Sequence, residues 1–457
     1  MDNNTLAKNR ILTAQIEAFA SDGAGVCRVD GRAVFVKGAL PGETWEIKLT
    51  KVTPAAVWAV GLQMLSASPD RREAPCPVYG KCGGCAALHM SYEAELRFKL
   101  SRVNEALRRI GGADLRITEI LGAEKTEGYR NKSILNVAAG PDGPVAGFYR
   151  PRSHDVVPAE SCLIQSELSC RAVRAVLDWM REHRIEPYSE ADGKGQVRHI
   201  FTRCAFRTGE AMACVVTARG FGGGNNAALV DALRAACPEL TGIVLCVNKS
   251  RGNTVLDGDF HTLWGSDTIT EALCGLSFEL SPLSFFQINP PQAEKLYAKA
   301  LEYASPDGAG TVLDLYCGAG TISLCLARGA KQVIGAEIVP EAVENARCNA
   351  LRNGIDNVRF ICADASEAAA RLQQEGVKPD AVVVDPPRKG LSPEVIGTIA
   401  AMAPARVAYV SCDPATLARD IKIFAEYGYL PAAGCCVDMF THTAHVETVV
   451  LLQRENS

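Results

Sequence analysis

The stretch TVLDLYCGAG, at residues 311–320, decides the fold class of this chain. A short run of apolar and β-branched residues leads into a turn that contains two glycines, and a helical pattern follows it. The glycines allow a tight turn and a close approach of the backbone to a ligand at the start of that helix. The spacing is not GxGxxG and no Lys-Ser/Thr pair follows, which disfavours dinucleotide and ATP sites.

The same alternation of strands and helices continues from this stretch to the end of the chain. Such a series is typical of a doubly wound, mostly parallel α/β sheet of the Rossmann type. Two more strand-like runs, at residues 434–439 and 445–452, close the chain. The pattern predicts strands over residues 311–316, 332–337, 380–384 and 406–411, and helices over 322–327, 341–353, 393–402 and 416–427.

The residues that precede this series have a different character. Residues 8–65 alternate apolar and polar with turn residues between the runs, which predicts a small antiparallel β-barrel. A helix is predicted over residues 91–110, and a mixed α+β region extends to about residue 280. We therefore expect a multidomain protein, divided into a barrel (1–67), a central α+β domain (68–280) and a C-terminal α/β domain (281–457).

Acidic side chains recur where the predicted parallel strands end. Asp314 opens the glycine turn, Glu337 ends the next strand, and Asp364 follows the strand after that. A carboxylate at the position of Glu337 can accept hydrogen bonds from ribose hydroxyls, and one at Asp364 can accept from an adenine amine. The set suits S-adenosylmethionine, which carries an amino acid, a ribose and an adenine but no phosphate. Each carboxylate alone is more often a helix cap than a ligand.

A candidate nucleophile lies at the same predicted edge of the sheet. Cys412 follows the strand at 406–411, and Asp385 begins the stiff loop DPPRKG after the strand at 380–384. A cysteine inside a strand is usually structural, whereas one at the carboxyl end of a parallel strand lies where ligands bind. A thiolate that adds to carbon 6 of uracil makes carbon 5 nucleophilic enough to accept a methyl group. Glu447, in the last strand, is the candidate base for the carbon 5 proton.

Composition limits the remaining possibilities. The chain has 457 residues, 47% hydrophobic and 22% charged, with a net charge of -4, so it is an ordinary globular protein without a strongly basic surface. No apolar run is long enough to span a membrane, and the first four residues do not resemble a signal peptide. We expect a cytoplasmic protein whose 18 cysteines are in a reducing compartment. Four of them, Cys76, Cys82, Cys85 and Cys162, could bind zinc or an iron–sulfur cluster.

Several motifs together resemble one family. The motifs SFFQIN (284–289), DLYCGAGT (314–321), DPPRKG (385–390), SCDP (411–414) and HVETV (445–449) are similar to those of RNA uracil-5 methyltransferases that use S-adenosylmethionine. The resemblance implies that Cys412 is the nucleophile and Glu447 the proton acceptor. It implies cofactor contacts by Gln287, Tyr316, Glu337, Asp364 and Asp385. It also implies that Cys76, Cys82, Cys85 and Cys162 hold a [4Fe–4S] cluster of the kind found in the 23S ribosomal RNA enzymes of this family.

The N-terminal residues carry a second resemblance. Residues 8–65 are similar to the TRAM module, a small RNA-binding barrel, through the stretches at 22–26 and 35–43. The stretch YRNK, residues 129–132, also matches the family, and stacking by Tyr129 with phosphate contacts by Arg130 and Lys132 is expected. The expected partner is RNA, most simply 23S rRNA, with no membrane and a monomeric chain.

Other functions fit the residues less well. Transfer RNA is the main alternative substrate for the same chemistry. A non-catalytic RNA-binding or ribosome assembly factor would not require Cys412 and Glu447 together. A radical-type RNA-modifying enzyme needs a CxxxCxxC triad, which the sequence lacks. An amino-group methyltransferase uses an Asp/Asn-Pro-Pro-aromatic loop, and Arg388 replaces the aromatic residue here.

Overall fold

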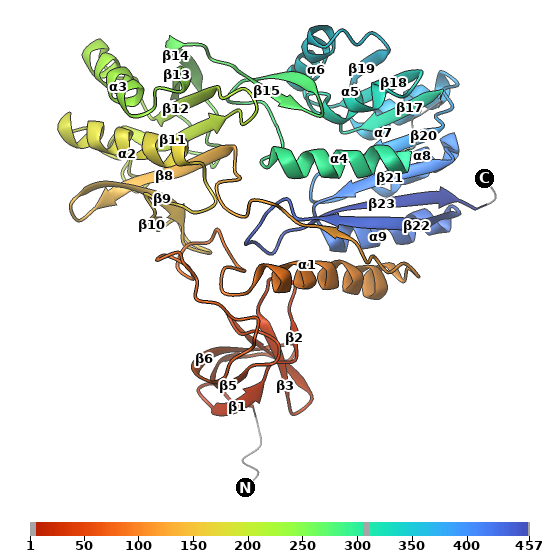
Figure 1. The fold of residues 1–457 in the computed structure, drawn as a ribbon, viewed down its shortest axis with the longest axis horizontal. Coiled ribbons are helices and arrows are strands. Elements are labelled where there is room, and N and C mark those ends of the chain that lie inside the picture. Colours follow the sequence, from red (N-terminus) through yellow and green to blue (C-terminus); the bar gives the residue numbers. More distant parts are fainter. Residues whose placement is uncertain (1–5, 305–309, 456–457) are drawn as a thin grey trace. The chain divides into compact units, whose positions relative to one another are not determined.

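The computed structural model describes residues 6–304 and 310–455. The first four residues, on which the signal-peptide prediction rests, lie outside these ranges. The described chain divides into two compact units (Figure 1). Unit 1 comprises the chain up to Arg102 together with His442–His445, and unit 2 comprises Val103–Thr441 and the chain from Val446 onward.

Unit 1 begins with a six-stranded β-sheet over the residues for which a small β-barrel was predicted. Its six strands have the order β1-β5-β6-β4-β3-β2 and enclose an apolar core that includes Val34, Val36, Ile47 and Leu49. Most neighbours are antiparallel as predicted, but β4 pairs with β6 in parallel. The strands are β1 (Ile11–Gln15), β2 (Ala18–Phe19), β3 (Gly25–Val29), β4 (Arg32–Val36), β5 (Thr44–Val52) and β6 (Val57–Ser66).

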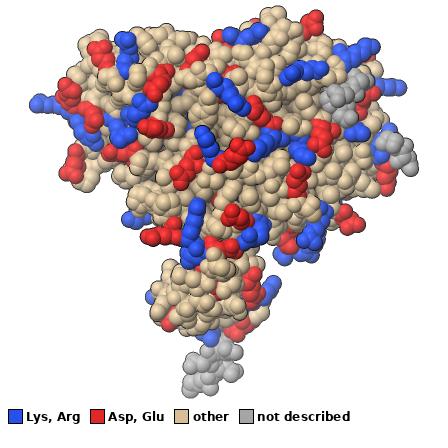
Figure 2. Space-filling view, in the orientation of Figure 1, with Lys and Arg blue, Asp and Glu red and all other residues tan. Residues whose placement is uncertain are grey.

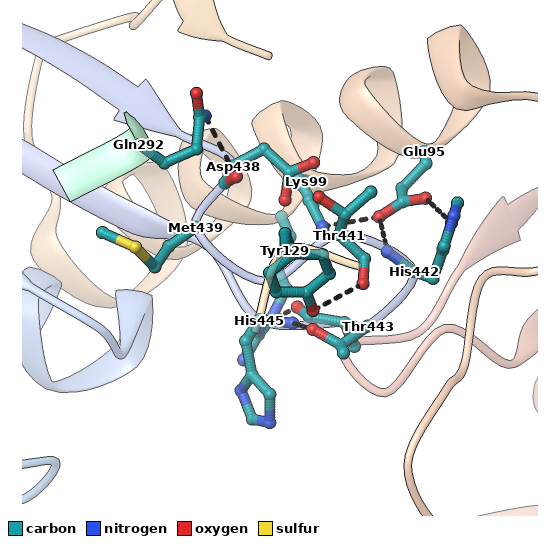
Figure 3. Close-up of polar contacts among 12 residues, drawn as sticks. Glu95, Lys99, Tyr129, Gln292, Asp438, Met439, Thr441, His442, Thr443 and His445 are labelled. Atoms are coloured by element: carbon teal, nitrogen blue, oxygen red, sulfur yellow. Dashed lines mark hydrogen bonds and ion pairs between the residues drawn. The ribbon is translucent and has the colours of Figure 1, made fainter. Parts of the chain in front are cut away.

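The rest of unit 1 is a cysteine-containing loop and most of helix α1 (Tyr92–Ala106). The predicted helix 91–110 is correct up to residue 106, after which Leu107–Gly111 form a π-helical turn. A buried carboxylate on α1, Glu95, pairs with Lys99 (Nζ to Oε1, 2.6 Å) and accepts from the backbone N–H of His442 (2.6 Å). Figure 3 shows this group, which ties residues 442–445 into unit 1.

The first half of unit 2 is a seven-stranded, mixed sheet with the order β10-β9-β8-β11-β12-β13-β14. The helices α2 and α3 pack together on it (Figure 1). Every residue of β11 and β12 is buried, so these two strands form its centre. The elements are β8 (Lys132–Gly140), β9 (Gly143–Tyr149), β10 (Val156–Pro158), α2 (Glu167–Glu182), β11 (Val197–Cys204), β12 (Ala211–Thr217), α3 (Gly223–Ala236), β13 (Leu240–Val247) and β14 (Asp259–Gly265).

The second half of unit 2 contains the predicted α/β sheet. The eight strands have the order β19-β18-β17-β20-β21-β23-β22-β7. The strands from β17 to β21 are parallel, and β23 runs antiparallel to β21 and β22. The two-residue strand β7 (Ile120–Leu121), far upstream in the chain, pairs with β22 at the edge of the sheet. This addition was not predicted from the sequence.

The bounds of these elements are close to the predicted ones because buried parallel strands are continuous apolar runs, such as AVVV in β20. Helix α4 packs against β20, β21 and β23, whereas α7, α8 and α9 pack in a row. After the hairpin β15 (Ile269–Leu273) and β16 (Leu276–Leu280) come α4 (Pro290–Ala304), β17 (Thr311–Leu315), α5 (Thr321–Ala327), β18 (Gln332–Glu337), α6 (Pro340–Arg352), β19 (Val358–Cys362), α7 (Ala365–Gln374), β20 (Ala381–Val384), α8 (Pro393–Met402), β21 (Arg406–Ser411), α9 (Pro414–Glu426), β22 (Tyr429–Val437) and β23 (Glu447–Arg454).

One apolar core links the two halves of unit 2. It includes Phe201 and Met212 of the first sheet and Val312, Val383 and Val410 of the second. The edge of the second sheet is therefore held on a rigid scaffold. Among the described residues, no helix is both long and apolar enough to cross a bilayer.

Candidate functional site

The register of the sheet brings the predicted site residues of four strands to one edge. Leu315 of β17 pairs with Val384 of β20, so the residues that follow, Tyr316 and Asp385, leave the sheet side by side. The parallel strand β21 ends beside β20, and Cys412 is its next residue. Because β23 is antiparallel, its first residue rather than its last lies at this edge.

Cys412 and Glu447 meet through the pairing of β21 with β23. Ser411 pairs with Thr448, so the next residue in each direction, Cys412 and Glu447, continues the same ladder. Cys412 is half-buried and Glu447 is 4% exposed. The charge of Glu447 acts on the Cys412 thiol, so the two side chains predicted to act together lie close to each other at this end of the sheet.

The electrostatics of this pair are those of a desolvated site. Burial, together with the negative charges of Glu447 and Asp385, raises the pKa of the Cys412 thiol to about 11. Burial, reinforced by Asp385, raises the pKa of Glu447 to about 8, and the positive charge of Arg388 acts in the opposite direction. Burial raises the pKa of Asp385 itself to about 7. Two buried carboxyl groups with raised pKa values beside a thiol are the kind of acid–base set that occurs at functional sites.

The glycine turn after β17 has the geometry expected of a ligand loop. Tyr316 has a φ of 69°, and Gly318 and Gly320 also have positive φ values. A Cβ atom at Gly318 would meet nothing within 4 Å, so the backbone there faces open space. Glu337 accepts from the backbone N–H groups of Gly318 (Oε2, 3.1 Å) and Val339 (Oε1, 3.0 Å). Glu337 therefore lies against the glycine turn.

Asp314 lies beneath the turn instead of facing solvent. Its side chain is fully buried, and Ser323 donates a hydrogen bond to Oδ2 (2.5 Å). Within the described residues its Oδ1 has no partner. Burial raises the pKa of Asp314 to about 7. A buried oxygen without a donor, directly under an open glycine turn, fits a site for a positively charged ligand group such as the amine of S-adenosylmethionine.

Asp364 has a structural role that the sequence left open. It is exposed, and its Oδ1 accepts from the backbone N–H groups of Ser366 (2.8 Å) and Glu367 (2.9 Å), which makes it the N-cap of α7. Its charge also contributes to raising the pKa of Tyr316, after burial. Asp364 is therefore near the turn, but one oxygen is already used as a cap.

The loop DPPRKG is held by two residues of α9 that the sequence analysis did not identify. Asp420 is fully buried and accepts from the backbone N–H of Leu391 (2.7 Å) and the hydroxyl of Tyr409 (2.6 Å). Arg419 pairs with Asp420 (2.7 Å) and donates to the carbonyl of Lys389 (2.8 Å). This clamp fixes the loop that carries Asp385 and Arg388. A charged residue in the apolar stripe of α9 was the available sequence signal.

Gln287 lies on the loop before α4 and is 7% exposed. Its carbonyl accepts from the side-chain amide of Asn131 (2.9 Å). The expectation that Tyr129 stacks on RNA is wrong, because its ring is 3% exposed and its hydroxyl donates to the carbonyl of Thr441 (3.0 Å) (Figure 3). In this extended stretch, positions 129 and 131 point inward, and only Arg130 and Lys132 are half-buried.

The four predicted metal ligands are divided between the two units. Cys76, Cys82 and Cys85 belong to one half-buried loop of unit 1, and Cys162 belongs to unit 2. Burial, and to a smaller degree the nearby Cys76, raise the pKa of Cys82, whose sulfur accepts from the backbone N–H of Gly84 (3.3 Å). Within residues 6–304 and 310–455, no three His, Cys, Asp or Glu side chains are arranged to hold a metal ion.

Two family models match this chain. The family model described as tRNA (Uracil-5-)-methyltransferase matches residues 272–455, and the TRAM domain model matches residues 7–58. A Clostridium tetani protein named as an uncharacterized RNA methyltransferase is 41% identical over 97% of this chain and 96% of its own length. A Halalkalibacterium halodurans protein of similar name is 42% identical over 98% of both chains.

One solved structure matches nearly the whole chain. It is the tRNA (uracil-54, C5)-methyltransferase of Pyrococcus abyssi in complex with S-adenosyl-L-homocysteine. The two chains are 28% identical, with a TM-score of 0.77, and the match covers 96% of this chain and 99% of the other. This chain therefore belongs to the S-adenosylmethionine-dependent RNA (uracil-5-)-methyltransferases and carries a TRAM domain at its N-terminus.

Proposed function

We propose that this enzyme transfers a methyl group to carbon 5 of a uridine in RNA, with Cys412 as the nucleophile and Glu447 as the proton acceptor. The observation that carries the proposal is the cross-strand pairing of β21 with β23, which makes these two residues neighbours. Their shared electrostatic environment supports it. A non-catalytic RNA-binding factor would not need a desolvated thiol and carboxyl group beside a cofactor turn.

The reaction follows from these groups. The Cys412 sulfur forms a bond to carbon 6 of uracil, and the electrons of the 5,6 double bond move onto oxygen 4 as an enolate. S-adenosylmethionine supplies the methyl group as an electrophilic sulfonium substituent. Carbon 5 then attacks that methyl group, which leaves S-adenosylhomocysteine. Glu447 accepts the proton of carbon 5, the S–C6 bond breaks, and the double bond of the 5-methyluracil product forms again.

The resting thiol must lose its proton before it attacks. With a pKa of about 11 it is protonated at neutral pH, so a neighbouring base is required. Glu447 has to be ionised later to accept the carbon 5 proton. We therefore assign the thiol proton to Asp385, whose pKa of about 7 suits a base at neutral pH.

The cofactor contacts are proposed for residues at the same edge. Glu337 is proposed to bind the ribose hydroxyls of S-adenosylmethionine, and Gln287 and Tyr316 to contact its methionine end. Asp385 is proposed to lie between the cofactor and the uracil. We further propose that Asp314, whose Oδ1 has no partner among the described residues, binds the amine of S-adenosylmethionine. Asp364 remains a proposed adenine contact through the oxygen that does not cap α7. We also retain the division into domains 1–67, 68–280 and 281–457.

The proposed target is a uridine of 23S rRNA, because the chain combines a TRAM module with the predicted cluster cysteines. Transfer RNA is a second candidate, and a specific observation favours it: the matching Pyrococcus abyssi enzyme is named for uracil 54 of tRNA. An RNA substrate and a high cysteine content also fit a cytoplasmic enzyme. We expect it to act as a monomer, because the proposed site is built from one chain.

We further propose that Cys76, Cys82, Cys85 and Cys162 ligate a [4Fe–4S] cluster. The donor set fits this group chemically, since all four are thiols and a backbone N–H already points at one sulfur. The cluster would stabilise the fold around the cysteine loop, and no step of methyl transfer uses it. Anaerobic purification followed by iron and sulfide analysis tests it: about four iron atoms per chain are expected, and loss of iron in Cys76→Ser. One zinc per chain would contradict the assignment.

The function is tested by mapping 5-methyluridine in rRNA and tRNA from a strain that lacks the gene. We expect one or more sites to lose the methyl group in 23S rRNA and to regain it with the wild-type gene but not with Cys412→Ala. Loss confined to tRNA would replace the substrate assignment. Restoration by Cys412→Ala would support a non-catalytic factor instead.

A further inference from the structure

A cationic cluster lies beside the loop that carries Gln287. It consists of Arg130, Lys132 and Arg203, all in unit 2. Arg203 of β11 pairs in register with Lys132 of β8, and Arg130 precedes Lys132 by two residues in the extended chain. Arg130 lies just before β8 and is close enough to Lys132 for its charge to act on that side chain; both residues are half-buried, whereas Tyr129 and Asn131 are buried.

Arg203 is unusual because its positive charge is buried without a counter-charge. The residue is 2% exposed, and one Nη2–H donates to the carbonyl of Ser284 (2.6 Å). In the described part of the chain its Nε and Nη1 atoms have no hydrogen-bond partner. Burial lowers the pKa of its guanidinium to about 10. The face of the Phe201 ring, whose centroid lies 5.7 Å from the guanidinium carbon, offsets only part of the cost of burying this charge.

The other two cations are also unneutralised. Within the described residues, none of the three pairs with a carboxylate, and the buried Nε of Arg130 has no partner. Burial, together with the charges of Arg203 and Arg130, lowers the pKa of Lys132 to about 8. An anion placed against Lys132 and Arg130 would relieve the mutual repulsion of all three groups.

The net charge of the chain does not supply a general attraction for RNA. Figure 2 shows positive and negative side chains interspersed over the visible face, and the net charge is -4. A local site is therefore needed to hold a polyanion at the catalytic edge. The cluster meets this need because the two chain segments that carry it are each hydrogen-bonded to the loop of Gln287. Arg203 binds the carbonyl of Ser284, and Asn131 binds the carbonyl of Gln287.

We propose that Arg130 and Lys132 bind a backbone phosphate of the substrate RNA. Arg203, which pairs in register with Lys132, adds its positive charge to this site and positions the loop of Gln287. The inference rests on the proposed RNA methylation and names the part of the substrate that is held here. The half-buried Lys132 and Arg130 contact the phosphate. Arg203 is a positioning residue, because its unpartnered nitrogens are enclosed by protein and act through their charge.

The test measures binding of a fluorescent 12-nucleotide oligouridylate as a function of salt concentration. Each lost phosphate contact lowers the slope of log affinity against log salt by about 0.7 for a single strand. We expect Lys132→Gln to lower the slope by this amount and to weaken binding about tenfold at low salt. Lys132→Arg keeps the charge and should retain the wild-type slope. The matched control is Lys331→Gln. Lys331 is an exposed lysine directly before β18, at the end of that strand that lies away from Glu337 and the proposed site.

Arg203 is tested in the same assay with a second readout. Arg203→Gln should weaken RNA binding and raise the KM for RNA about tenfold or more. Arg203→Lys keeps the positive charge and should restore the KM toward the wild-type value. Circular dichroism checks that each variant is folded. An unchanged salt slope in Lys132→Gln would overturn the phosphate site. If the wild-type enzyme binds the oligomer with this slope but methylates no RNA, the proposed function fails while the phosphate site stands.

Discussion

The buried carboxyl group of Glu447 should make the enzyme less stable as the pH rises, and Glu447→Gln should remove the part of this pH dependence that Glu447 contributes. Burial raises the pKa of Glu447 from 4.5 to about 8 in the folded protein. Between these values the unfolded chain has lost the proton while the folded protein retains it. Stability therefore falls as the pH rises through this range and is constant above about 8.

The magnitude follows from the size of this change. Each pH unit between 4.5 and 8 costs about 1.4 kcal/mol, so the cost is about 2 kcal/mol at pH 6 and about 5 kcal/mol at pH 9. Relative to wild type, the free energy of unfolding of Glu447→Gln should thus increase by about 3 kcal/mol between pH 6 and pH 9. The same substitution should abolish turnover, because an amide cannot accept the carbon 5 proton.

The assay is urea unfolding of both proteins at pH 6 and pH 9, followed by circular dichroism. Glu344→Gln, which changes an exposed carboxylate on α6, serves as the control and should follow wild type at both pH values. Equal pH dependence in Glu447→Gln and wild type would refute the reasoning that this carboxyl group is protonated in the folded enzyme. Full turnover by the variant would refute its role as the base.

Three further outcomes follow from the same site. The rate of methyl transfer at saturating substrates should increase with pH up to about 8 and then level off, since Glu447 must be ionised; a flat profile from pH 6 to 8 would count against this. Gly390→Ala should lower kcat and the free energy of unfolding, because the added Cβ atom would lie 2.5 Å from the Asp420 carboxylate. Gly376→Ala is the control, since Gly376 has a similar φ but open space around it; urea unfolding should show a loss of only about 1–2 kcal/mol from backbone strain. Glu337→Gln should weaken S-adenosylhomocysteine binding about tenfold by calorimetry, and an unchanged Kd would exclude Glu337 from the cofactor site.

The sequence predicted the α/β sheet well because its signal is local. Parallel strands buried on both faces are continuous apolar runs, and the helices between them start at caps such as Asp413 before Pro414. The short strand Ile120–Leu121 could not be predicted, because two residues carry no periodicity and its partner lies more than 300 positions away. The parallel pairing of β4 with β6 is likewise a choice between non-local partners.

The residues of the candidate site also differ in whether their signal in the sequence is local or depends on remote residues. The sequence could place Cys412, Asp385 and Glu447 at one edge of the sheet, because their motifs lie at the ends of predicted strands. Tyr129 was misread because burial depends on Thr441, which is remote in sequence. Arg203 was missed because its only signal is a cation within the otherwise buried strand VRHIFTRC.

The central claim is that the Cys412 sulfur bonds to carbon 6 of the target uracil. Its most direct test is mass spectrometry of the enzyme after reaction with S-adenosylmethionine and substrate RNA that contains 5-fluorouridine, whose fluorine cannot leave as a proton does. The account predicts a stable protein–RNA complex in which the modified peptide carries the nucleotide on Cys412. Attachment to another residue, or methyl transfer by Cys412→Ala at the wild-type rate, would contradict it.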